Sequence, residues 1–216
     1  MSQIGNIYTE HHASNRPKNF TIMEADRAEF LKESIGTGKK VLDIGCRNGV
    51  LTKHFADGNI VWGVDIDPVA LGEAKELLQN KNTQNKFFEM DLLADWSELN
   101  GEKFDVIVCG EVLEHLYFPE RVVQKVVAHL NQGGIFLGSV PNAFSLKNRV
   151  RLAMGKKKGT PLSDPTHINH FSLHELFHLF EKYFTYVKVE GLGRYRKLVK
   201  FSPQHFAFDL IWKCIK

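Results

Sequence analysis

From about residue 40 onward, the chain alternates short apolar runs with longer segments that are apolar on one face. The apolar runs are rich in Val, Ile and Leu, which is typical of parallel strands buried on both faces of a sheet. The segments between them have the length and spacing of helices. The expected strands are Lys40–Ile44, Ile60–Asp65, Lys86–Met90, Phe104–Cys109 and Gly134–Val140.

Local signals place the helices. Asp67 before Pro68 provides a capping carboxylate and a proline at the first helical position, and Ser172 with Glu175 forms a capping box. The expected helices are Ile22–Ser34, Gly49–Ala56, Pro68–Asn80, Pro119–Leu130 and Leu173–Lys182. Two later strands, near Tyr186–Glu190 and Ala207–Trp212, follow a helix and a short reversal, so we expect them to form an antiparallel pair.

Together these elements predict an α/β fold of the Rossmann-like, doubly wound kind. We expect a mostly parallel sheet with helices on both faces and an antiparallel strand at its C-terminal edge. Ligands of such sheets bind at the carboxyl ends of the strands.

The composition narrows the class of protein. A chain of 216 residues is long enough for one domain with a full core. Its 43% hydrophobic and 25% charged residues exclude a disordered chain, and no apolar run approaches the roughly 20 residues of a bilayer span. The N-terminal segment lacks the apolar core of a secretory signal, and Cys46, Cys109 and Cys214 lie far apart. We therefore expect reduced thiols in a cytoplasmic protein.

The segment VLDIGCRNGVLT, residues 41–52, carries the sharpest motif. A buried strand containing Asp43 runs into a turn with Gly45 and Gly49, and glycine lets a backbone turn tightly or approach a ligand. Asp65 ends the next strand about 20 residues later, where a carboxylate can accept both hydroxyls of a ribose. The spacing of the two glycines does not match the G-x-G-x-x-G of dinucleotide-binding folds.

The same segment resembles motif I, D-x-G-x-G-x-G, of the class I S-adenosylmethionine-dependent methyltransferases. The resemblance extends from about Lys40 to Glu190 and includes GVDIDP, FFEMDLL, FDVIVCGEVLEHL and GGIFLGSVPN in the family's order. It implies S-adenosylmethionine as the cofactor, with Asp65 on the ribose and Asp91 near the adenine amino group. The cofactor-binding residues that it implies are Asp43, Gly45, Cys46, Gly49, Asp65, Ile66, Asp91, Leu92 and Gly110.

The chain departs from this motif at Arg47, which stands where the family has its middle glycine. If the position requires a positive φ, an arginine there is strained. The side chain either faces solvent, which is the simpler interpretation, or meets the cofactor carboxylate. We expect cofactor binding to survive the substitution.

Glu111, Glu114 and His115 follow the fourth strand in the string E-x-x-E-H. This string resembles the ubiquinone-biosynthesis O-methyltransferases and the small-RNA 3′-end 2′-O-methyltransferases. In the second group both glutamates, this histidine and a later one hold a divalent ion, and His167, five residues before the capping Ser172, matches the later histidine. Two carboxylates and two imidazoles suit Mg²⁺, Mn²⁺, Fe²⁺ or Zn²⁺.

Two other interpretations of this string stay open, because many small methyltransferases share it without a metal. In the first, His115 is the catalytic base, a common role for histidine near neutral pH, and Glu114 orients it. In the second, these residues are purely structural. His170, His174 and His178 recur every four residues and are expected to lie on the surface or to pack, not to bind a metal.

Positive charge gathers in two stretches, Lys147–Lys158 and Arg194–Lys200. The first lies in the region Ala143–Ser163, which contains no acidic residue and has Val150 and Met154 among its basic residues. Three interpretations of this charge stay open. It forms a solvated helix face, or it binds a phosphate-bearing acceptor. In the third, it attracts a polyanion, either an anionic membrane that Lys147–Lys158 contacts or an RNA backbone. RNA is supported least, since the stretch Lys147–Lys158 has no RNA-binding module and no stacking aromatics.

The resemblance thus implies a methyltransferase, and we expect it to methylate a hydroxyl of a small, lipid-linked or glycan-type acceptor. The alternatives are an RNA-terminal 2′-O-methyltransferase and a non-catalytic module that binds the cofactor. The single domain, 1–216, divides into an N-terminal cap and helix, a cofactor-binding core, an acceptor-recognition insertion, and a C-terminal helix with edge strands: 1–36, 37–140, 141–171 and 172–216. A lid formed by residues 1–20 and the oligomeric state are left open.

Overall fold

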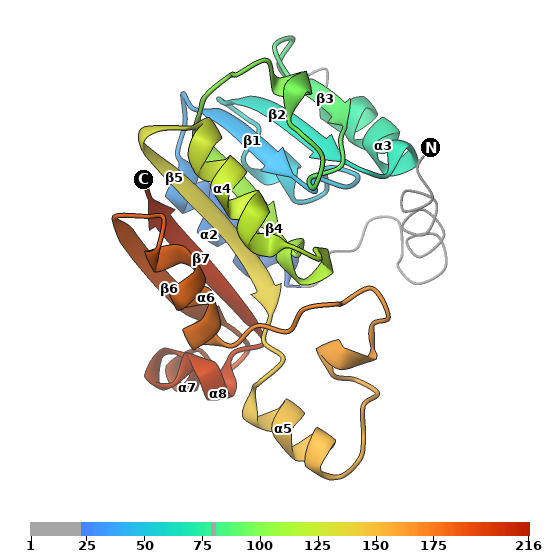
Figure 1. Cartoon of the computed structure of the whole chain (residues 1–216), viewed down its shortest axis with the longest axis vertical. Helices are drawn as coiled ribbons and strands as arrows, with labels where there is room; N and C mark the ends of the chain where they lie inside the picture. Colours follow the sequence, from blue (N-terminus) through green and yellow to red (C-terminus); the bar gives the residue numbers. More distant parts are fainter. Residues whose placement is uncertain (1–22, 79–80) are drawn as a thin grey trace. The chain divides into compact units, whose positions relative to one another are not determined.

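The computed structural model describes residues 23–78 and 81–216. Seven strands form a sheet in the order β3-β2-β1-β4-β5-β7-β6, with helices around it (Figure 1). This mostly parallel α/β arrangement confirms the expected Rossmann-like fold class. The strands are β1 (Lys40–Ile44), β2 (Ile60–Asp65), β3 (Lys86–Glu89), β4 (Phe104–Gly110), β5 (Leu130–Pro141), β6 (Tyr186–Leu192) and β7 (Asp209–Ile215).

Two of the helices begin at the predicted caps. Asp67 Oδ1 accepts the backbone N–H groups of Val69 and Ala70 at 3.0 and 3.3 Å, and the capping box of Ser172 and Glu175 is formed. None of the helices in the described ranges combines the length and hydrophobicity that a membrane span requires. The α-helices are α2 (Glu24–Ile35), α3 (Pro68–Leu78), α4 (Pro119–His129), α5 (Leu146–Ala153), α6 (Leu173–Glu181), α7 (Arg196–Phe201) and α8 (Pro203–Phe206).

The described residues up to Val108, together with His129–Gly134, form a first compact unit. In this unit β1 pairs with β2, and β2 with β3, all in parallel. Helix α3 packs against β2 and β3. The carboxyl ends of β1 and β2 therefore open at the same edge, where the glycine motif and Asp65 lie.

The second unit comprises Cys109–Ala128 and Ile135–Lys216. Here β7 pairs antiparallel with both β5 and β6, so the two late strands form the expected antiparallel pair. Fully buried aromatic rings fill the core of this unit. The Phe136 centroid lies 5.5 Å from that of Trp212 and 5.6 Å from that of Phe180.

The predicted helix over Gly49–Ala56 is wrong, because only a 3₁₀ turn, Thr52–His54, forms there. Gly49 and Gly58 have left-handed backbones, with φ of 74° and 76°. The few residues between them cannot offset the cost of nucleating an α-helix. The sequence pattern also missed α5, α7 and α8, since several of their apolar side chains are exposed rather than arranged in a buried stripe.

The first predicted helix forms as α2, which begins at Glu24. Residues 1–22 lie outside the described residues, and with them most of the expected N-terminal cap and the segment 1–20, for which a lid is left open. Positions 79 and 80, at the expected end of α3, also lie outside.

Asp43 is a carboxylate inside the first unit, only 4% exposed. Thr52 Oγ1 donates a hydrogen bond to its Oδ2 at 2.7 Å, which connects β1 to the 3₁₀ turn. Burial raises the pKa of Asp43 to about 7, and the charge of Asp65 adds to this rise, although Thr52 and Arg27 oppose it. Folding therefore favours the neutral form of this side chain.

Gly138 on β5 has no room for a side chain, because a Cβ there would stand 2.1 Å from the Cys109 carbonyl oxygen and 2.2 Å from Cζ2 of Trp212. We expect Gly138→Ala to lower the free energy of unfolding by about 2 kcal/mol or more, measured by urea denaturation. Gly72→Ala in α3 is the matched control, since its Cβ meets nothing within 4 Å. It should leave stability unchanged or raise it by about 0.5–1 kcal/mol. Equal stabilities of the two variants would contradict this packing.

Asp43 also predicts a pH dependence of stability. Between the ordinary pKa of an aspartate and a value of about 7, the folded protein keeps a proton that the unfolded chain releases. The contribution of Asp43 to the free energy of unfolding therefore falls as pH rises, by up to about 1.4 kcal/mol per pH unit.

Asp43→Asn removes this proton and keeps an acceptor for Thr52. We expect the variant to gain stability relative to the wild type as pH rises through this window, and the difference to level off above it. Urea unfolding at a series of pH values measures this difference in the free energy of unfolding. Asp57→Asn is the control, because Asp57 is exposed. A difference that does not change with pH would refute the assignment.

Candidate functional site

The turn after β1 is built from left-handed residues. Gly45 and Gly49 have φ of 73° and 74°, and Arg47 has φ of 49°. The backbone N–H groups of Gly45 and Cys46 donate to the Val64 carbonyl on β2 at 2.8 and 3.1 Å. Arg47 therefore has the positive φ that strains a residue other than glycine. A left-handed backbone at such a residue costs on the order of 1 kcal/mol.

Asp65 ends β2 beside this turn and is 8% exposed. Its Oδ2 accepts the backbone N–H of Arg47 at 2.7 Å, and its Oδ1 accepts that of Asp67 at 2.9 Å. The carboxylate therefore stabilises the strained backbone of Arg47. A carboxylate can accept about four hydrogen bonds, so ribose hydroxyls are compatible with these two backbone donors.

Asp91 and Leu92 follow β3 in the first unit. Asp91 Oδ1 accepts the N–H of Leu93 at 2.8 Å, and Trp96 Nε1 donates to the Leu92 carbonyl at 3.2 Å. These contacts give the segment a defined turn after the strand. The other implied cofactor residues are the half-buried Ile66, the buried Cys46, whose thiol pKa is raised by burial, and Gly110 at the end of β4 in the second unit.

The residues of the first unit fit S-adenosylmethionine. Asp43 and Asp65 lie close enough for the charge of one to raise the pKa of the other. The Asp65 carboxylate beside the glycine turn favours a ligand with hydroxyl donors and positive charge. The cofactor carries both, in its ribose hydroxyls and in its ammonium and sulfonium groups.

In the second unit, β4 leads into Glu111, which has a left-handed backbone with φ of 58°. The Glu111 N–H donates to the Ser139 carbonyl at 2.8 Å, and the Ser139 hydroxyl donates to Glu111 Oε1 at 3.0 Å. Both contacts reach β5 and hold the strained residue in place. Backbone strain of this kind clusters at functional sites.

Glu114, His115 and His167 come together although they are distant in sequence. One potential ligand atom from each lies within 4.8 Å of the others. Glu114 is buried, at 2% exposed, His115 is half-buried, and the side chain of His167 is 7% exposed. Of the four predicted ligands, the described residues bring these three together, whereas Glu111 is not a member of the group.

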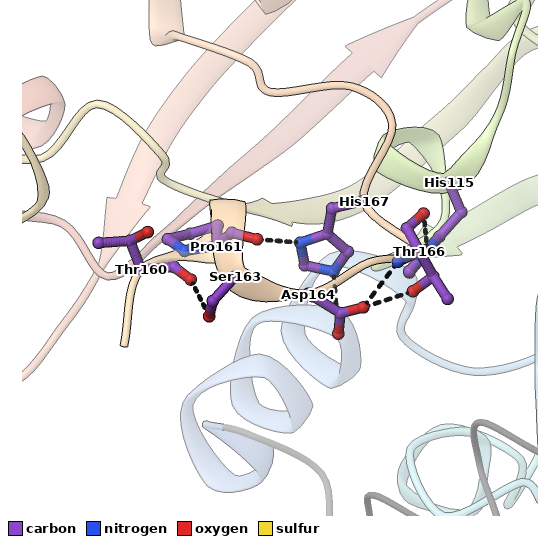
Figure 2. A network of polar contacts seen from close by, with 7 residues as sticks. All are labelled: His115, Thr160, Pro161, Ser163, Asp164, Thr166 and His167. Carbon is purple, nitrogen blue, oxygen red and sulfur yellow. Dashed lines mark hydrogen bonds and ion pairs between the residues drawn. The ribbon is translucent and has the colours of Figure 1, made fainter. Parts of the chain in front are cut away.

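Main-chain carbonyls fix the two imidazole rings (Figure 2). Nδ1 of His115 donates to the Thr166 carbonyl at 2.9 Å, and Nδ1 of His167 donates to the Pro161 carbonyl at 3.0 Å. A carbonyl only accepts, so Nδ1 carries the proton in each neutral ring and Nε2 carries the lone pair. Each ring is therefore in the tautomer that binds a metal or takes up a proton through Nε2.

The loop that carries His167 is held against Glu114 by the main chain. Ile168 and Asn169 both donate their backbone N–H to the Glu114 carbonyl, at 2.9 and 2.8 Å. Upstream, Asp164 Oδ1 accepts the N–H of Thr166 at 3.0 Å and its hydroxyl at 2.7 Å. Asp164 Oδ2 lies 3.8 Å from Nε2 of His167, and Figure 2 shows both interactions.

Sequence reasoning missed Pro161, Asp164 and Thr166, which position this group, and Ser139, which holds Glu111. Pro161 and Thr166 act through carbonyl groups, which every residue has, so no residue type marks them. The role of Asp164 could have been predicted from the local sequence, since an aspartate side chain often accepts the backbone N–H two residues later and so forms a turn.

Within the described part of the chain, His170, His174 and His178 are not members of the group of three. His174 and His178 are exposed on α6, with their Nε2 atoms 2.8 Å apart. His170 is half-buried, and burial, followed by the charges of His167 and Lys157, lowers its pKa.

Comparison with known proteins connects these features to a family. A family model described as a methyltransferase domain matches residues 13–188. The chain is 40% identical over 110 residues to a ubiquinone biosynthesis O-methyltransferase of Haemophilus ducreyi, covering 49% of this chain and 46% of that protein. It is 33% identical over 119 residues to the Pseudomonas fluorescens protein of the same name, covering 53% and 50%. The chain thus spans about half the length of the curated relatives it matches.

Solved structures show the same fold at low sequence identity. An S-adenosylmethionine-dependent methyltransferase from Archaeoglobus fulgidus has a TM-score of 0.68 at 17% identity, over 97% of this chain and 99% of that chain. The small RNA methyltransferase HEN1 has a TM-score of 0.70 at 19% identity, over 94% of this chain and 26% of that chain. With the family match, which covers most of the sequence, they establish that the chain belongs to the methyltransferase-domain family and has the fold of the class I S-adenosylmethionine-dependent methyltransferases.

Proposed function

We propose that the protein transfers the methyl group of S-adenosylmethionine to a hydroxyl oxygen of a small or lipid-linked acceptor in the cytoplasm. The observation that carries this proposal is the group of Glu114, His115 and His167, with both rings held in one tautomer. A hydroxyl acceptor must be oriented and must lose its proton, and this group offers both functions. The names of the curated relatives support an oxygen acceptor with a lipid tail.

The transfer is an in-line displacement in which the cofactor supplies the electrophile. The acceptor oxygen forms a bond to the methyl carbon while the carbon–sulfur bond breaks, and S-adenosylhomocysteine leaves. Asp65 holds the ribose, and the glycine turn lets the backbone approach the cofactor closely. The hydroxyl proton must pass to a base, and Nε2 of His115 carries the lone pair for this step when no metal occupies it.

The ligand atoms of this group are best suited to a divalent metal ion. Two imidazoles and one carboxylate suit Fe²⁺, Mn²⁺ or Zn²⁺, whereas Mg²⁺ prefers oxygen ligands. When bound, such an ion lowers the pKa of a coordinated hydroxyl and orients it. Glu114, His115 and His167 would hold it, and Glu111 as a further ligand stays a prediction.

The cofactor assignment predicts binding of S-adenosylhomocysteine that depends on Asp65. We expect Asp65→Asn to weaken binding at least about tenfold in titration calorimetry, because a charged acceptor of the ribose hydroxyls becomes a neutral one. Asp57→Asn is the matched control, since this aspartate is exposed and lies in the same unit. If the folded wild type does not bind S-adenosylhomocysteine, the proposal fails. Equal affinity in the two variants would remove Asp65 from the site.

The metal assignment predicts a binding site that depends on Glu114. Titration with Co²⁺, followed by its visible absorption, should show one site whose affinity is weakened more than about tenfold in Glu114→Gln. The exposed pair His174 and His178 could take up the probe as well. Both proteins should therefore carry His174→Ala, with Glu175→Gln on α6 as the matched control for loss of a glutamate.

Activity in the presence of a chelator separates the two forms of the mechanism. Loss of activity on chelation and recovery with Mn²⁺ or Fe²⁺ is expected if the metal orients the acceptor. Activity that persists in chelator and is lost in His115→Gln would instead assign His115 as the base.

A further inference from the structure

Two segments of the second unit contain no acidic residue, 142–163 and 191–208. Together they carry ten of the chain's 28 Lys and Arg and none of its 25 Asp and Glu, so the rest of the chain is net acidic. The mild overall charge of +3 therefore conceals a strong local excess of positive charge. The basic residues are Lys147, Arg149, Arg151, Lys156, Lys157, Lys158, Arg194, Arg196, Lys197 and Lys200.

The two segments are joined in the fold. Helix α8 packs against both α5 and α7, and the three helices lie together in Figure 1. The side chain of Asn142 donates to the carbonyls of Gln204 and Ala207 at 3.2 and 3.1 Å, and that of Asn148 donates to the Asn142 carbonyl at 2.8 Å. These buried amides hold the two positively charged segments side by side.

Large apolar side chains stand exposed among these charges. On α7 only Val199 is buried, whereas Phe201 is 85% exposed and Leu198 is 46% exposed. Tyr195, at the start of this helix, is 64% exposed, and Met154, next to α5, is 60% exposed. We call residues 142–163 and 191–208 the basic–apolar face.

We propose that the basic–apolar face docks on the surface of a bilayer that contains anionic lipids. Lysine and arginine attract the negative headgroups, and the aromatic and aliphatic side chains gain free energy by entering the boundary between headgroups and acyl chains. An RNA backbone would pair with the basic side chains, but it would not explain why the apolar side chains of Leu198 and Met154 are exposed. Pairing of two copies of the protein through this face is disfavoured, because both faces carry positive charge and repel each other.

This docking places the second unit at a membrane, which is where a lipid-linked acceptor is found. The docking itself requires neither the cofactor nor the metal. Its failure is therefore distinguishable from failure of the proposed function, which rests on binding of S-adenosylhomocysteine.

Co-sedimentation of the full chain with lipid vesicles tests the proposal. We expect binding to vesicles of phosphatidylcholine with phosphatidylglycerol, little binding to phosphatidylcholine alone, and release by salt. Lys200→Gln should lower the partition coefficient about fivefold, and Phe201→Ser about tenfold. The matched controls are Lys75→Gln on α3, which changes net charge equally, and Tyr186→Ser on β6, an aromatic that is 47% exposed outside the face.

Three outcomes would overturn the proposal. The first is binding to both kinds of vesicle alike, or equal binding by the face variants and their controls. The second is a single-stranded RNA that displaces the protein from vesicles and binds Phe201→Ser as tightly as the wild type. The third is a dimer in sedimentation equilibrium that Phe201→Ser dissociates, without binding to anionic vesicles.

Discussion

The carbonyl oxygen of Glu114 accepts the backbone N–H groups of Ile168 and Asn169, and the three grouped side chains depend on this contact. It aligns two loops that are far apart in the sequence. The loop that carries His167 then supplies the Thr166 and Pro161 carbonyls that fix the rings of His115 and His167. Because main-chain groups make these bonds, the arrangement survives changes of side chain at Ile168 and Thr166 as long as the backbone path is kept.

The turns after β1 and β4 each place a strained residue next to a polar contact. Arg47 has a left-handed backbone whose N–H is bound by Asp65, and Glu111 has one whose N–H and side chain are bound by Ser139. In each case the surrounding hydrogen bonds hold a conformation that the residue alone disfavours. Asp65 therefore has a structural role in the turn besides the ribose contact proposed for it.

Regular elements and motif positions could be predicted from the sequence, because each has a local cause. The strands β1 and β2 have the predicted bounds, since Val and Ile runs end at turn residues. The segment after Gly49 could not be predicted, because the left-handed turns at both of its ends appear only in the folded backbone. The grouping of His167 with His115 required the family pattern, since hydrogen bonds between distant main-chain groups leave no trace in residue type. The exposed face of α7 was missed because a search for buried stripes does not register apolar residues that point outward.

The groups that accept the Nδ1 hydrogen bonds of the two imidazole rings affect how long a metal ion would stay bound. Many metal-binding histidines donate to a carboxylate, which makes the ring a stronger electron donor. Here the partners are the neutral carbonyls of Thr166 and Pro161, and Asp164 Oδ2 lies 3.8 Å from Nε2 of His167 rather than at Nδ1. If these residues hold an ion as proposed, the rings would be well oriented but weakly polarised, which would favour an exchangeable ion over one that is retained through purification.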